Sequence, residues 1–144
     1  MARVSTYLIF AGTTEAAFSF YKSVFQTEYV TPIVRFDSAP PNPAAPLQEA
    51  DKQMVLHVAL PILGGHLLMG SDCPPSSGMS VTPGNAVHIN LEPDTRAETK
   101  RLFDALSAGG KVEMELQDMF WGDYYGSFED RFGVHWMVNC RSKA

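Results

Sequence analysis

The chain has 144 residues, of which 45% are hydrophobic and 19% charged, and its formal net charge is −5. This composition fits one domain or two small modules that share a core, and it excludes a disordered chain. The acidic balance argues against a nucleic-acid partner. No apolar stretch approaches the roughly 20 residues of a membrane-spanning helix. Two cysteines do not form a disulfide framework, and a strand pattern begins too early for a signal peptide, so we expect a cytoplasmic protein.

Strand and helix patterns alternate in the first half of the chain. The predicted elements, in order, are a strand at Thr6–Phe10, a helix at Thr14–Phe25, and strands at Thr27–Phe36, Met54–Leu63 and His66–Ser71. Thr13 or Thr14 is the expected helix cap. Gly64-Gly65 predicts the turn of a hairpin, and the four prolines within 37–53 predict a loop.

A proline- and glycine-rich linker at 73–84 precedes the second half, which has a more regular pattern. The predicted elements are a strand at Ala86–Glu92, a helix at Asp94–Ala108, and strands at Lys111–Leu116, Tyr124–Phe128 and Val134–Cys140. Thr95 and Glu98 form a capping box, and Gly109-Gly110 is typical of a helix end.

The predicted strand at Lys111–Leu116 alternates apolar and charged residues. Val112 and Met114 would share one face, because alternate residues of a strand point to opposite sides. Glu113 and Glu115 would then lie on a solvated face, and we assign them no part in a site.

The two halves of the chain repeat each other. Tyr7–Phe10 corresponds to His88–Leu91, and the following helices correspond at the same offset (88 − 7 = 81; 95 − 14 = 81). A second match joins Gly64–Leu68 to Gly133–Met137 at an offset of 69 (133 − 64). We therefore predict one domain, 1–144, built from module one at 1–72, the linker, and module two at 85–144.

Several segments resemble one known family. The phrase LQDMFWGDYYG at Leu116–Gly126, followed by DRFGVHWMVN at Asp130–Asn139, is similar to the PhnB-like branch of the vicinal oxygen chelate superfamily. Ala17–Phe25, Gly64–Asp72 and Asn90–Asp94 support the match. This superfamily groups glyoxalases, bleomycin-resistance proteins and extradiol dioxygenases, and its PhnB-like members are often labelled demethylubiquinone methyltransferase-like.

The resemblance implies an α+β fold, in which two βαβββ modules form a half-open, barrel-like cleft. It also implies a homodimer, for which we expect Trp121–Tyr125 to provide contacts. The methyltransferase label implies little about chemistry, because the chain has no glycine-rich strand–loop–helix of the kind that methyltransferases use for their cofactor.

Strand alternation predicts which residues line the cleft. In a sheet covered by a helix on one side, apolar residues such as Leu8 and Ile89 pack under the helix, and their neighbours point away from it. On the first strand of each module, the residues turned toward the cleft are therefore Tyr7, Ile9, His88 and Asn90.

The hairpins add further candidates. Trp136 and Val138 belong under the helix, so their neighbours point to the cleft. The 69-residue match transfers the same pattern to module one. The ligand-binding residues expected from the two hairpins are His66, Leu68, His135 and Met137.

Metal-dependent members of the superfamily place one His, Glu or Gln on each of four strands, and the resemblance carries these positions to Tyr7, Leu68, His88 and Met137. Only His88 is a good ligand, and one imidazole cannot retain a catalytic ion. We therefore expect no metal and no other cofactor. A rearranged site of His66, His88 and His135 is the alternative, although the two hairpin histidines lie about 6–7 Å along a strand from the ligand positions.

Other aromatic and histidine side chains have two interpretations each. Trp121 and Tyr124 could stack on a planar or apolar ligand, or they could serve core packing and dimer contact. His57, between apolar neighbours in a strand, is more typical of a sheet-surface histidine than of a catalytic one.

We therefore predict a metal-free cleft protein that binds a small apolar or aromatic molecule, with His88 as its general base or hydrogen-bond donor. One alternative is a metal-dependent lyase or dioxygenase of the same superfamily. Another is a module that sequesters a ligand without catalysis, as in antibiotic-resistance relatives. Tyr7, Asn90 and His88 would serve binding and catalysis equally, so the sequence leaves both open.

Overall fold

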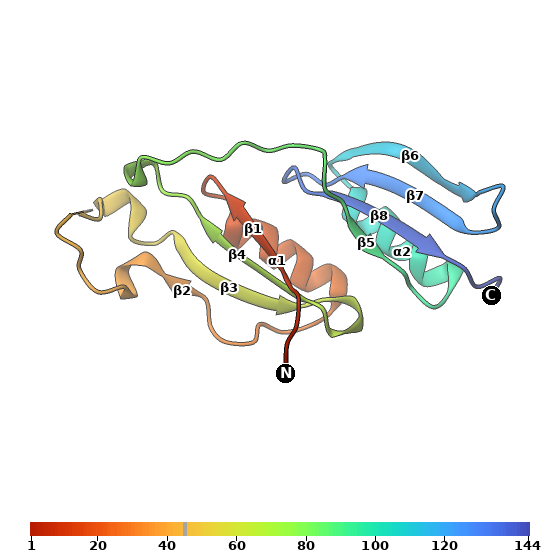
Figure 1. Cartoon of the computed structure of the whole chain (residues 1–144), viewed down its shortest axis with the longest axis horizontal. Coiled ribbons are helices and arrows are strands. Elements are labelled where there is room, and N and C mark those ends of the chain that lie inside the picture. Colours follow the sequence, from red (N-terminus) through yellow and green to blue (C-terminus); the bar gives the residue numbers. More distant parts are fainter. Residues whose placement is uncertain (45) are drawn as a thin grey trace. The chain divides into compact units, whose positions relative to one another are not determined.

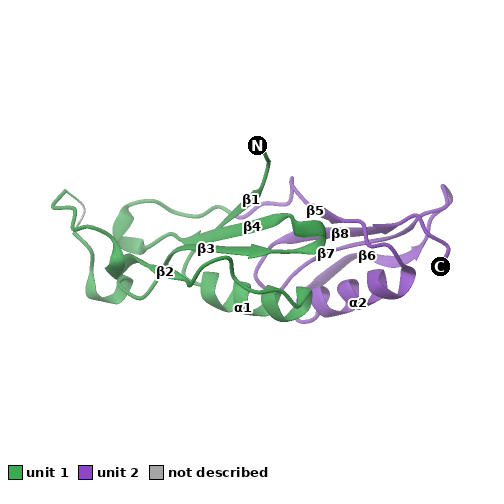
Figure 2. Cartoon of the chain, turned by 90° about the horizontal axis from the view of Figure 1, so that it is seen from below, with its two compact units in different colours: residues 1–82 green, residues 83–144 purple. Residues whose placement is uncertain are grey.

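The computed structural model describes residues 1–44 and 46–144 and forms two units, residues 1–82 and 83–144 (Figure 2). Ala45, which belongs to the predicted loop at 37–53, lies outside the described residues. Short 3-10 turns at Phe36–Ser38 and Glu49–Asp51 occur within or beside this loop.

The first unit has a sheet with a helix on one of its faces (Figures 1 and 2). Its elements are β1 (Thr6–Phe10), α1 (Thr14–Phe25), β2 (Val34–Arg35), β3 (Val55–Pro61) and β4 (Leu67–Asp72). The sheet order is β1-β4-β3-β2, in which β1 and β4 are parallel and the other neighbours are antiparallel.

The second unit repeats this plan. Its elements are β5 (Ile89–Leu91), α2 (Arg96–Ser107), β6 (Lys111–Asp118), β7 (Tyr124–Glu129) and β8 (His135–Cys140). The sheet order is β5-β8-β7-β6, with β5 and β8 parallel and the other neighbours antiparallel. The predicted α+β duplication of a βαβββ unit is therefore confirmed, and each unit buries its core between its helix and its sheet.

The two helices begin in different ways. Thr95 accepts a hydrogen bond from the Glu98 amide at 3.1 Å, as the capping box predicts. The side chain of Thr13 makes no such bond at the start of α1. The carboxylate of buried Asp72 on β4 instead accepts bonds from the amide and hydroxyl of Thr14. Across the described residues, no helix has both the length and the apolar character needed to cross a membrane.

The strand predicted at Thr27–Phe36 is wrong over most of its length. Only Val34–Arg35 forms a strand, with a register shift against β3. The Val30 amide donates to the Ala59 carbonyl at 3.0 Å, so part of the segment runs beside β3. Pro32 has no amide hydrogen to give to a ladder, which accounts for the interrupted pairing.

The turn between β3 and β4 follows the glycine prediction. Gly64 and Gly65 have φ of 69° and 79°, a left-handed conformation that glycine adopts without steric cost. The Ile62 amide closes the hairpin by donating to the His66 carbonyl at 2.8 Å.

The 69-residue match between the hairpins is three residues out of register. Leu8 pairs with Gly70, and Ile89 pairs with Trp136. The first-strand offset is 89 − 8 = 81, so the hairpins correspond at 136 − 70 = 66. Because strand side chains alternate, an odd shift moves each transferred residue to the opposite face.

Candidate functional site

The candidate site lies on the face of the second sheet that α2 does not cover. Trp136 and Val138 are fully buried on the helix side, which turns the alternate residues of β8 to the other face. Neighbouring strands continue this helix-free face through cross-strand pairs, since Met137 pairs with Asn90 on β5 and with Ser127 on β7.

His88 is placed beside His135 by the parallel pairing of β5 and β8. It directly precedes β5, and the next residues, Ile89 and Trp136, are paired. The two imidazole rings have centroids 5.1 Å apart and are tilted by 55°. The prediction that alternation turns His88 away from the helix thus brings it next to a second histidine.

Glu113 reaches the same place through a bulge in β6. Val112 pairs with Phe128 but Met114 pairs with Ser127, so β6 carries one extra residue at Glu113. A bulge interrupts the alternation of a strand and redirects a side chain. The expectation that Glu113 only covers a solvated face is therefore corrected, because its carboxylate meets both imidazoles.

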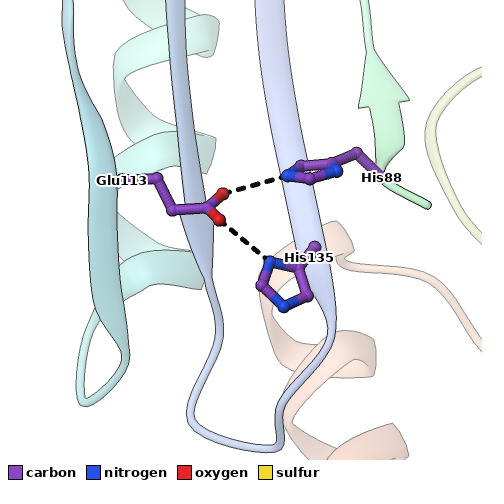
Figure 3. A group of neighbouring side chains, drawn as sticks. All are labelled: His88, Glu113 and His135. Atoms are coloured by element: carbon purple, nitrogen blue, oxygen red, sulfur yellow. Dashed lines mark hydrogen bonds and ion pairs between the residues drawn. The ribbon is translucent and has the colours of Figure 1, made fainter. Parts of the chain in front are cut away.

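The three side chains form one hydrogen-bonded cluster (Figure 3). His88 Nε2 lies 3.0 Å from Glu113 Oε1, and His135 Nδ1 lies 3.1 Å from Glu113 Oε2. The side chains of His88, Glu113 and His135 are 21%, 31% and 9% exposed, respectively. The cluster is thus fixed by the sheet on one side and open to a ligand on the other.

The carboxylate orients both rings. An ionised carboxylate only accepts hydrogen bonds, so neutral His88 carries its proton on Nε2 and leaves Nδ1 as an acceptor. Among the described residues, no hydrogen-bond partner lies at His88 Nδ1. His135 has a second carboxylate nearby, because its Nε2 lies 4.0 Å from Glu129 Oε1. A carboxylate-oriented imidazole with a free nitrogen can accept a proton from a bound molecule.

Other predicted residues of the second unit fall into two groups. Asn90 and Met137 lie side by side on the helix-free face, and the Tyr125 hydroxyl lies 4.0 Å from the sulfur of Met137. Tyr124 does not join them, since the Arg96 guanidinium covers its ring at 3.9 Å. Trp121 lies in the β6–β7 loop, with its ring edge-on to Tyr125.

In the first unit, Tyr7 and Ile9 lie on the exposed face of the sheet, and each is 46% exposed. The Tyr7 hydroxyl lies 3.1 Å from His57 Nδ1, and the two rings stack. His66 Nε2 lies 2.9 Å from the hydroxyl of Thr6.

Leu68 is a correction. It was expected on the ligand face, but it is fully buried and pairs with Thr6 and Leu60 on the helix-covered side. The cause is the odd error in the hairpin match, which reverses the face of every residue transferred through it.

Comparison with known proteins identifies the superfamily to which this fold belongs. A family model described as Glyoxalase/Bleomycin resistance protein/Dioxygenase superfamily matches residues 3–138, and the chain belongs to that superfamily. Protein YjdN of Escherichia coli K12 is 32% identical over 142 residues, which cover 94% of this chain and 93% of YjdN.

Two solved structures give the same result. Protein PA1353 from Pseudomonas aeruginosa is 35% identical with a TM-score of 0.83, over 97% of this chain and 98% of its own. A PhnB protein from Bacillus cereus, labelled as a candidate 3-demethylubiquinone-9 3-methyltransferase, is 26% identical with a TM-score of 0.76. That match covers 96% of this chain and 99% of the Bacillus protein, so the PhnB-like resemblance seen in the sequence is confirmed.

Proposed function

We propose that the protein binds a small apolar or aromatic molecule on the helix-free face of its second unit, and that His88 exchanges a hydrogen bond or a proton with it. The observation that carries this proposal is the 3.0 Å contact between His88 Nε2 and Glu113 Oε1. The contact fixes the ring and leaves Nδ1 as an acceptor, which is the arrangement of a general base held by a carboxylate.

The surroundings of His88 support an apolar ligand with one acidic hydrogen. Met137 and Tyr125 supply a polarisable and an aromatic surface on the same face, and Asn90 adds an amide that can donate or accept. Apolar walls around a few placed polar groups are typical of small-molecule sites. Catalysis and simple binding both use this arrangement, and we propose binding as the common step.

A fragment screen tests this function. The full chain is titrated with aromatic phenols and, as matched controls, with their methyl ethers, while amide chemical shifts are followed by NMR. Phenols should shift residues around Asn90 and Met137 more than the ethers do, because only phenols donate to His88 Nδ1.

His88→Gln should weaken phenol binding by roughly tenfold, the cost of about one hydrogen bond, and should leave ether binding unchanged. His57→Gln, in the other unit, is the control. A screen in which no fragment perturbs the helix-free face of the second sheet would count against the function.

We also propose a homodimer formed through the tip of the β6–β7 hairpin. Phe120 and Trp121 are 96% and 52% exposed, and they pack edge-on against each other. Exposed neighbouring aromatics and an edge strand are features that association with a second copy would cover. For the cellular location we propose the cytoplasm, since Cys73 and Cys140 are both free thiols.

A further inference from the structure

We propose that His88, Glu113 and His135 bind one divalent transition-metal ion within the second unit. The inference deepens the proposed function, because it concerns the same site, but it depends on a different property of the three side chains. It also differs from the four-strand arrangement that the superfamily resemblance implies, with which it shares only His88.

The geometry of the cluster suits a metal ion. One ligand atom from each side chain, two imidazole nitrogens and one carboxylate oxygen, lies within 4.8 Å of the others. The two imidazoles face different oxygens of the carboxylate, with His88 Nε2 3.0 Å from Oε1 and His135 Nδ1 3.1 Å from Oε2. Ligands bound at about 2.0–2.2 Å in a tetrahedral shell lie roughly 3.3–3.6 Å apart, so small rotations of the side chains would suffice.

The support for the ligands also suits a metal site. Imidazole ligands usually direct their other ring nitrogen to a carboxylate or carbonyl, which fixes the tautomer and raises the basicity of the ligand. His135 has carboxylates on both sides, since its Nδ1 lies 3.1 Å from Glu113 and its Nε2 lies within ion-pair distance of Glu129, at 4.0 Å. Glu129 is therefore a positioning residue rather than a ligand.

The three proposed ligands lie on, or directly beside, strands of the same sheet. His135 lies on β8, His88 directly precedes the neighbouring strand, and Glu113 occupies the bulge of β6 (Figure 3). His135 is paired within the ladder, and His88 and Glu113 are each next to a paired strand residue, Ile89 and Val112 respectively. Both His88 and Glu113 remain partly exposed, which leaves coordination positions for water or a ligand.

The ligand set selects the class of ion. Two imidazoles and one carboxylate suit zinc, nickel, cobalt, iron or manganese, whereas magnesium and calcium prefer an all-oxygen set. The four strand positions that the family resemblance implies contain only one imidazole, His88, which is too few ligands for a metal ion. The bulge at Glu113 and the cross-strand position of His135 raise that count to three ligands within one unit.

The test uses the full chain stripped with a chelator and titrated calorimetrically with Zn²⁺ and Ni²⁺. We expect about one equivalent per chain with micromolar or tighter affinity, and no comparable binding of Mg²⁺ or Ca²⁺. Cobalt loading should give visible absorption bands that shift when a histidine ligand is lost.

Glu113→Gln and His88→Gln should each weaken zinc binding by about 100-fold, and Glu129→Gln by roughly tenfold, as expected for an outer-sphere partner. The matched controls are Glu115→Gln on the same strand and His57→Gln in the first unit. Thermal unfolding of each variant checks that it is folded. His135→Gln changes a nearly buried side chain, so the exposed Glu113 carries the decisive comparison.

Two results would overturn the metal site: no stoichiometric binding of any of these ions, or equal loss in the Glu115 control. The phenol titration is repeated with and without the ion to separate the two proposals. Phenol binding by a chain that takes up no stoichiometric metal ion retains the proposed function and removes the metal site. Metal binding without any fragment binding retains the metal site and removes the proposed function.

Discussion

The two units have the same strand order but present different chemistry at equivalent positions. The paired strands place Tyr7 and Met69 of the first unit where the second unit has His88 and His135 (88 − 7 = 81; 135 − 69 = 66). The first unit thus offers a phenol and a thioether, and the second offers two imidazoles. Among the described residues, the group of three possible metal ligands therefore lies in the second copy of the fold.

The edge strands explain why the difference extends to a third group. β2 contains only Val34–Arg35, whereas β6 has eight residues and a bulge at Glu113. The two-residue strand β2 has no position equivalent to the bulge that holds Glu113 in β6. The core strands therefore provide the platform in both units, and the edge strand β6 completes the site in the second.

The largest effects should come from removing one buried, multiply hydrogen-bonded carboxylate in each unit, Asp72 or Asp130. Asp72 accepts from Val55 as well as from Thr14, and Asp130 accepts from two turn amides and the Trp136 indole. Asp72→Ala and Asp130→Ala should each lower the free energy of unfolding by about 3 kcal/mol or more, because buried donors lose their acceptor.

Urea denaturation measures both carboxylate variants against Asp94→Ala, which changes an exposed aspartate. Equal stability of all three proteins would show that the buried carboxylates are replaceable by water. A loss confined to one unit would show that the two copies differ in how their helices and turns are fixed.

The next largest effects should come from glycines under the helices. An added Cβ would lie 2.6 Å from the Phe18 ring at Gly70, and 2.7 Å from the Phe103 ring at Gly126. Gly70→Ala and Gly126→Ala should each destabilise by about 1–3 kcal/mol through overpacking. Differential scanning calorimetry should show a lower unfolding midpoint for both variants. Gly84→Ala is the control and should leave the midpoint unchanged, because no atom beyond its chain neighbours lies within 4 Å of a Cβ added there.

The proposed dimer gives a smaller effect. Trp121→Ala should raise the dimer dissociation constant about tenfold, since it removes an exposed aromatic from the expected contact. Light scattering over a concentration series measures this change, and Val30→Ala, an exposed apolar residue of the other unit, is the control. A wild-type protein that is monomeric throughout the series would refute the dimer.

The smallest effect concerns an ion pair that each unit uses, with reversed charges, to tie its helix to its edge strand. Arg35 on β2 contacts Glu15 on α1, and Arg96 on α2 contacts Asp118 on β6. The hydrogen bond from Arg35 lowers the pKa of Glu15 below its ordinary value of 4.5. Because the folded state favours the ionised Glu15 carboxylate, this ion pair stabilises the fold above about pH 4.5. The contribution is lost as the pH falls through the folded-state pKa.

Glu15→Gln should therefore cost under about 1 kcal/mol at pH 7, and nothing once the pH is below the folded-state pKa, since exposed ion pairs contribute little. Stability curves at pH 7 and at pH 2 measure this. A cost that is equal at both pH values would assign the effect to packing rather than to charge.

Most elements of the fold followed from local patterns. The helix at Thr14–Phe25 and the strand at Thr6–Phe10 have the predicted bounds. The helix α2, Arg96–Ser107, lies within the predicted range Asp94–Ala108 and buries Leu102 and Leu106. These features depend on the spacing of residues that are close in the sequence, so periodicity alone predicts them.

The candidate site was only half predictable. Alternation predicted the orientation of His88 and Asn90, but it misplaced Leu68 and left Glu113 out. The signal for Glu113 was weak, because a strand with alternating charges looks the same whether or not it is bulged. The helix cap from Asp72 was likewise hidden, since its partner Thr14 is 58 residues away in the chain.

Local sequence patterns were enough to predict the duplication, most of the secondary structure and the side of the sheet on which His88 lies. The tertiary structure decided the strand register, the bulge in β6 and the meeting of Glu113 with two imidazoles. The physical reason is that strand periodicity specifies only alternation between two faces. One inserted residue, or an odd error in register, reverses that alternation, and only the pairing of distant strands reveals it.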